Sequence, residues 1–153
     1  TAIQANDLLG RKTARDGGAL ARALCARIAA TEQELAARGS EDCAAMRAGL
    51  QRARLALEAV VDFVASRAKT EVKAVHAGAV NYLRLAGLVL GGWQMARAQL
   101  AALERRAEDP DFHEAKLITA RFYAEALLPQ AEALAASVLA AGSTIERMRP
   151  ELF

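Results

Sequence analysis

Apolar residues recur along most of the chain at spacings of three and four, and this pattern predicts helices. The clearest case covers residues 41–68, where one seam contains Cys43, Met46, Leu50, Ala53, Leu57, Val60 and Val64. A second stripe, in residues 18–38, contains Leu20, Leu24, Ile28, Thr31 and Leu35. Seams of this kind pack against one another in antiparallel bundles.

Residues that favour helix ends separate these segments. Gly39 stands where a left-handed residue closes a helix, and Ser40 suits the N-cap of the next one. Thr70 is expected to cap a helix over 71–107. Its predicted inner face contains Tyr82, Leu85, Val89, Trp93, Ala96, Leu100 and Leu103. The glycines of this helix predict a close contact with another helix, and they are Gly87, Gly91 and Gly92.

A further helix is expected to begin at Asp109-Pro110-Asp111 and to reach residue 141, before Gly142-Ser143. Pro129 lies inside it and should kink it. Its predicted buried face contains Leu117, Arg121, Ala124, Leu128, Ala131, Ala135 and Val138, flanked by Phe112, Ala115, Ile118 and Phe122.

A shorter helix, from Ile3 to Ala14, precedes the helix-breaking pair Gly17-Gly18. The predicted fold is therefore all-α: an up-down-up-down four-helix bundle preceded by a short N-terminal helix. We expect two parts, residues 1–14 and residues 15–153, of which the second folds by itself as a bundle.

Composition excludes several classes of protein. The 153 residues are 54% hydrophobic and 25% charged with a net charge of +2, which fits a soluble globular protein without the basic stripe of a nucleic-acid binder. The longest apolar stretch, between Arg84 and Arg97, is shorter than the ~20 residues of a membrane span. Cys25 and Cys43 are expected too far apart for a disulfide, which favours a cytoplasmic location.

Convergent titratable groups are not found in the sequence. His76 and His113 are expected at opposite ends of antiparallel helices, so they cannot share a metal, and His113-Glu114 is interpreted as surface polar residues. The apolar face around Tyr82 and Trp93 is more typical of a core than of a ligand pocket. We therefore predict no catalytic residue and no metal ligand.

Two stretches resemble the acyl-CoA dehydrogenase family. Residues 1–12, TAIQANDLLGRK, resemble the last conserved helix of these enzymes. A C-terminal extension of one subgroup, the methylthiopropanoyl-CoA dehydrogenase-like proteins, is similar to NYLRL at 81–85, GGW at 91–93, AKL at 115–117, ARFYAE at 120–125 and LLP at 127–129. Because the chain opens on Thr1 in the middle of the first motif, we expect it to be part of a longer polypeptide.

The resemblance implies a chemistry for the full-length enzyme. A carboxylate removes the α-proton of an acyl-CoA thioester while FAD accepts hydride from the β-carbon, and that carboxylate precedes residue 1. Thr1, Ala2 and, less directly, Gln4 would lie near the flavin diphosphate in the full-length enzyme. The fragment itself is expected to bind no FAD. Its implied partners are the rest of the dehydrogenase chain and a second copy in a homodimer, and its implied role is structural.

Two other interpretations share the same composition. One is a free-standing helical interaction module, for example a small dimerising bundle. The other is a ligand-carrying or metal-carrying bundle, against which the missing ligand spacings argue.

Overall fold

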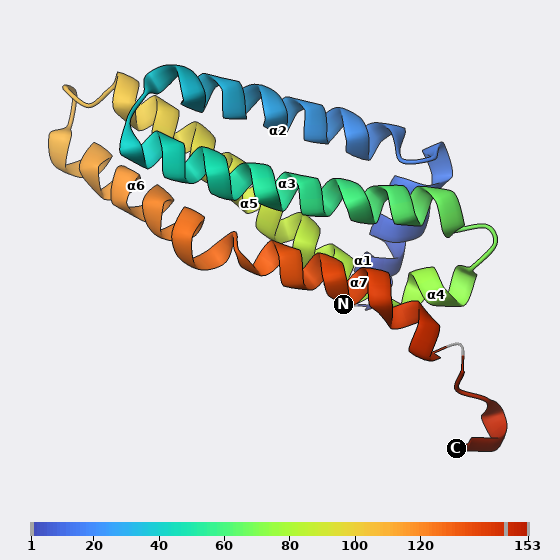
Figure 1. The fold of residues 1–153 in the computed structure, drawn as a ribbon. Helices are drawn as coiled ribbons and strands as arrows, with labels where there is room; N and C mark the ends of the chain where they lie inside the picture. The colour runs from blue at the N-terminus through green and yellow to red at the C-terminus, as the bar shows by residue number, and fades with distance from the viewer. Residues whose placement is uncertain (1, 146, 153) are drawn as a thin grey trace.

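The computed structural model describes residues 2–145 and 147–152, and this part of the chain is an all-α bundle, as predicted (Figure 1). A short N-terminal segment comes first: α1 (Ala2–Asp7), a π-helical turn η1 (Leu8–Thr13) and a 3-10 turn η2 (Ala14–Asp16). We call each long rod of the bundle a column, whether it is one helix or several that follow one another. The first two columns are α2 (Ala19–Arg38) and α3 (Glu41–Arg67). The third is α4 (Val72–Ala77) with α5 (Ala79–Glu104). The fourth is α6 (Pro110–Phe122), a π-helical turn η3 (Tyr123–Leu127) and α7 (Gln130–Ile145), followed by η4 (Pro150–Leu152).

The seam of α3 is the centre of the core. All seven of its predicted apolar positions are buried, and α3 contacts α2, α5 and α7. The predicted caps are confirmed as well. Ser40 accepts a hydrogen bond from the Cys43 amide at 3.2 Å, and Asp109 accepts one from the Phe112 amide at 3.1 Å. Gly39 has a φ of +65°, the left-handed conformation expected of a residue that closes a helix.

The stripe predicted for α2 is shifted at its start. Ile28, Thr31 and Leu35 are buried, but Leu20 is 65% exposed and Leu24 is only half-buried. Cys25 takes the buried position, and a Cβ on Gly18 would lie 3.0 Å from Cγ1 of Val61 on α3. The first turns of α2 therefore face α3 through residues one or two positions away from the predicted ones.

The single helix predicted over 71–107 is instead divided into α4 and α5 at Gly78. A Cβ on Gly78 would lie 2.7 Å from Cγ1 of Val138 on α7, so α7 occupies the space that a side chain would need. Thr70 does not cap α4, because its hydroxyl donates to the Arg67 carbonyl at 3.4 Å and Glu71 takes the N-cap position. The predicted inner face of α5 is buried from Tyr82 to Leu100.

The predicted interruption near Pro129 is confirmed, and the π-helical turn η3 precedes it. The expected end of this column is wrong. The helix does not end at Gly142-Ser143, because Gly142 packs against Ala74 of α4 and α7 continues to Ile145. The side chains of Phe112, Ile118 and Phe122 are exposed, since α6 turns Leu117 and Ala120 toward the core.

No helix in the described part of the chain is both long enough and apolar enough to cross a membrane.

Candidate functional site

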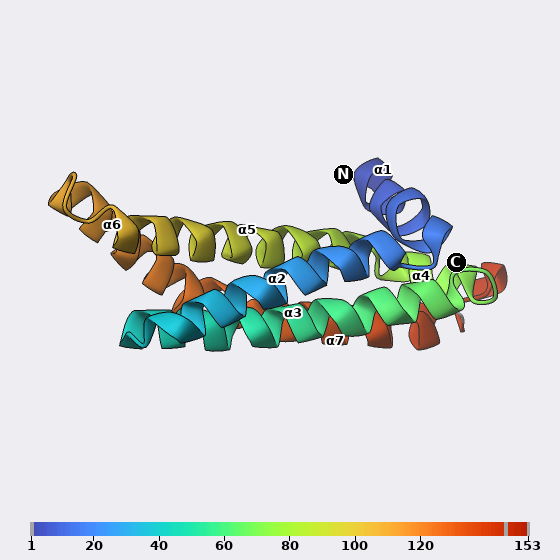
Figure 2. The same cartoon turned by 90° about the horizontal axis from the view of Figure 1, so that it is seen from above.

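The most distinctive site is the junction between the N-terminal segment and the bundle. α1 contacts α5, and η1 contacts α2, α3 and α5 (Figure 2). Ala5, Leu9 and Thr13 point inward at successive turns, with exposures of 0%, 1% and 1%. The π-helical turn adds a residue to the usual helical turn, and such turns are frequent at functional sites.

A buried pair of hydroxyl groups connects this segment to α5. The Thr13 hydroxyl donates to the Leu8 carbonyl at 2.9 Å and lies 2.7 Å from the Tyr82 phenol oxygen. Because a threonine hydroxyl has one hydrogen, Tyr82 must be the donor to Thr13. Burial raises the pKa of Tyr82 above its ordinary value, which keeps the phenol protonated as a donor.

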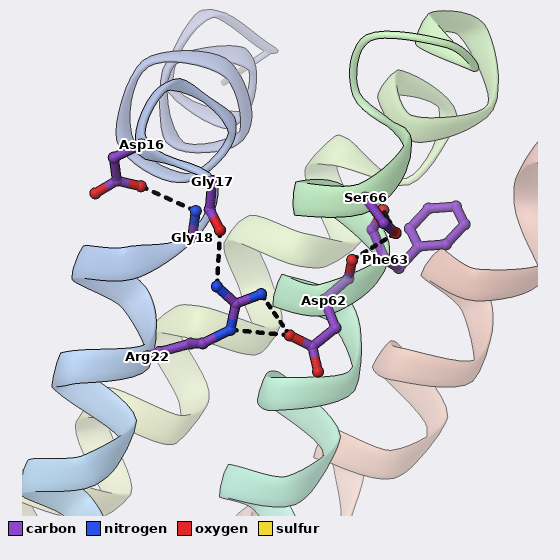
Figure 3. A network of polar contacts seen from close by, with 7 residues as sticks. All are labelled: Asp16, Gly17, Gly18, Arg22, Asp62, Phe63 and Ser66. Carbon is purple, nitrogen blue, oxygen red and sulfur yellow. Dashed lines mark hydrogen bonds and ion pairs between the residues drawn. The ribbon is translucent and has the colours of Figure 1, made fainter.

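A polar network holds the turn that follows (Figure 3). The two carboxylate oxygens of Asp16 accept hydrogen bonds from the amides of Gly18 and Leu20, and these backbone bonds, led by the one from Leu20, lower the pKa of Asp16. Arg22 donates to the Gly17 carbonyl at 2.7 Å and binds Asp62 of α3 through Nε and Nη2. The glycines have φ angles of +66° and +83°, and this left-handed pair lets the chain turn between η2 and α2.

The residues predicted to approach a flavin do not converge with this network. Ala2 and Gln4 lie on α1 with exposed side chains, turned away from the buried Ala5. Thr1 lies outside the described residues. Their predicted role near a flavin diphosphate stays a prediction.

The histidines need one correction. His76 is exposed, with Nδ1 2.8 Å from the Val72 carbonyl, but His113 is buried and not a surface residue. His113 lies four residues before the buried Leu117, so extending that stripe back by one turn would have found it. Within the described part of the chain its Nδ1 has no hydrogen-bond partner, and neither do the two side-chain polar atoms of Gln99, a buried residue that sequence reasoning missed.

The other buried polar groups are paired. Arg54 donates to both oxygens of Glu32 at 2.7 and 3.0 Å and to Glu58 at 2.9 Å, and these carboxylates raise its pKa. The Trp93 indole donates to Thr31 at 2.9 Å, so Trp93 and Tyr82 belong to the core, as expected.

Groups of three His, Cys, Asp or Glu residues arranged to hold a metal ion are absent from the described residues. Cys25 and Cys43 are both buried free thiols. The described residues form a helical-bundle domain with an N-terminal segment packed against α2, α3 and α5.

Comparison with known proteins identifies this class. Residues 24–149 match the family described as acetyl-CoA dehydrogenase C-terminal like. Over 137 residues, the chain is 42% identical to the 3-methylmercaptopropionyl-CoA dehydrogenase of Ruegeria pomeroyi. The match covers 87% of this chain but only 23% of that relative. The chain therefore belongs to the acetyl-CoA dehydrogenase C-terminal-like family, and the resemblance seen in the sequence is confirmed.

Proposed function

We propose that this chain is the C-terminal structural domain of an FAD-dependent acyl-CoA dehydrogenase. The full-length enzyme would remove hydrogen from the α and β carbons of an acyl-CoA thioester, and this domain would not take part in the chemistry. The observation that carries the proposal is the packing of the N-terminal segment against the bundle. Residues that resemble the last helix of the dehydrogenase body are buried against the bundle through Ala5, Leu9 and Thr13.

This packing gives the domain a mechanical role. A helix of six residues is marginal by itself, since most helical stability in proteins comes from tertiary packing. The bundle would therefore hold α1 in one orientation relative to α5. The hydrogen bonds of Asp16 and Arg22 would hold the turn that connects the N-terminal segment to α2.

The exposed face of α1 suits one edge of a flavin diphosphate. Gln4 offers an amide donor, and Ala2 is small enough to let phosphate oxygens come close to the helix. These two residues cannot enclose a flavin, so the rest of the enzyme would supply most of the contacts.

Ile118 and Phe122 lie four residues apart on one exposed face of α6, which we call the α6 face. Large exposed apolar side chains on one helix face are typical of a surface that another helix covers. We propose that it contributes to the homodimer contact of the full-length enzyme. Light scattering of the full-length enzyme would show a dimer that Phe122→Glu weakens, whereas Leu139→Glu, on the exposed side of α7, would not; the opposite pattern would contradict this role.

The non-catalytic role is tested with two purified proteins. The 153-residue chain should show no flavin absorbance and no acyl-CoA dehydrogenation, and the longer native polypeptide that contains it should show both. Flavin bound stoichiometrically to the short chain would overturn the proposal, as would a longer polypeptide that lacks both flavin and activity.

A further inference from the structure

A cavity of about 120 Å³ opens between η1, α2, α3 and α5. Aliphatic side chains from α2, α3 and α5 line it, among them Leu24, Leu57, Val61, Ala86 and Leu90. Leu57 and Val61 are buried, whereas Leu24 and Leu90 are half-buried, so the cavity leads from the core to the surface.

The hydroxyl groups beside the cavity are already paired. Thr13 and Tyr82 line its wall, and they bind each other and the Leu8 carbonyl. A buried water typically needs two to four polar partners, and apolar cavities without them stay dry and accept apolar ligands. Lys12 is the one charged residue among those that line the cavity, and its side chain is exposed to solvent.

We propose that this cavity binds a short aliphatic carboxylate, with the hydrocarbon tail between α2 and α5 and the carboxylate paired with Lys12. An apolar cavity of ~150 Å³ accepts a benzene ring, so a cavity of this volume suits a tail of about four to six carbons. The carboxylate is favoured over a neutral head group because the charged residue at the cavity is a cation. The site does not depend on the proposed function, since every lining residue belongs to this chain.

The test is a titration of the 153-residue chain, labelled at its Leu and Val methyl groups, with hexanoate. The methyl signals of Leu24, Val61 and Leu90 should shift, with a dissociation constant on the order of 1 mM for so small a ligand. Hexanol, which has the same tail without the charge, should bind about threefold more weakly, as expected for an exposed ion pair.

Two variants test the location of the site. Ala86→Leu fills the cavity and should abolish hexanoate binding, while Lys12→Gln should weaken hexanoate about threefold and leave hexanol unchanged. Leu139→Ala, on the groove between α3 and α7, is the matched control and should bind like the parent chain. Thermal unfolding of each variant verifies that it is folded.

Three results would overturn the proposal. The first is that hexanoate leaves all three methyl signals unshifted at the highest concentration tested. Binding to a folded Ala86→Leu variant with parental affinity would place the ligand elsewhere. Equal binding of hexanol and hexanoate, together with no effect of Lys12→Gln, would show that the site does not recognise a carboxylate.

Discussion

The Tyr82 phenol oxygen lies 2.7 Å from the Thr13 hydroxyl oxygen, and this contact joins two residues 69 positions apart in the sequence. Both side chains are buried, and the Thr13 hydroxyl donates its own hydrogen bond to the Leu8 carbonyl. The phenol of α5 is therefore the donor that secures the end of the N-terminal segment. The bundle and the segment become one packed unit through this contact.

Tyr82→Phe removes that donor and leaves the buried Thr13 oxygen without it. We expect the free energy of unfolding to fall by about 1–2 kcal/mol, and residues 2–16 to become more sensitive to protease. Tyr123→Phe is the matched control, because it removes a 3.0 Å hydrogen bond between η3 and the Leu88 carbonyl of α5 that does not involve the segment. Denaturant unfolding and limited proteolysis check both. Equal trimming of residues 2–16 in the two variants would contradict the fastening role of Tyr82.

Two helical glycines differ in their surroundings: Gly142 lies in a close helix–helix contact, and Gly87 lies on an open surface. A Cβ on Gly142 would collide with the backbone and side chain of Ala74, so Gly142→Ala should destabilise the fold by about 1–3 kcal/mol. No atom of the described residues outside this helix lies within 4 Å of a Cβ on Gly87, so Gly87→Ala should stabilise α5 by roughly 0.5–1 kcal/mol. Thermal unfolding measures both changes. A neutral Gly142→Ala variant would show that α4 and α7 do not pack this closely.

Stability should depend on pH through Cys25. Burial raises the pKa of its thiol from 9.0 to about 11, with Glu58 adding to the rise and Arg54 opposing it. The stabilisation from the buried neutral thiol is complete below pH 9 and is lost as pH rises toward 11, by up to about 1.4 kcal/mol per unit. Denaturant unfolding between these values should show a smaller loss for Cys25→Val than for the parent chain. Identical pH profiles would contradict burial of the thiol.

Gln99 offers a test of an unpaired polar group. Its amide nitrogen and oxygen are buried and have no hydrogen-bond partner in the described structure. Gln99→Met keeps the shape and removes both polar atoms, so we expect the free energy of unfolding to rise by about 1 kcal/mol. A clear loss of stability in denaturant unfolding would instead show that the amide is satisfied in the folded protein.

The sequence predicted the bundle because its strongest signals are local. The α3 seam repeats at helical spacing over its whole length, and Ser40 and Asp109 cap the helices that they precede. The division at Gly78 depends on Val138, sixty residues later, so no local pattern indicates it. The Thr13–Tyr82 pair was not predicted for the same reason, since only the folded chain brings the two hydroxyl groups together.

The phase of α2 shows a different limit. Leu20 and Leu24 continue the spacing of Ile28 toward the N-terminus, yet Cys25 is the buried residue and Leu20 is exposed. The left-handed Gly18 sets the start of the helix against Val61, and this packing overrides the preference of a leucine for burial.

The most direct test of the central claim is the mass of the native polypeptide in its source cells, detected with an antibody against this chain. The account predicts a polypeptide several times larger than 16.3 kDa that co-purifies with flavin absorbance, since the chain spans 23% of its dehydrogenase relative. A native polypeptide near 16.3 kDa without flavin would contradict it and would favour a free-standing helical module.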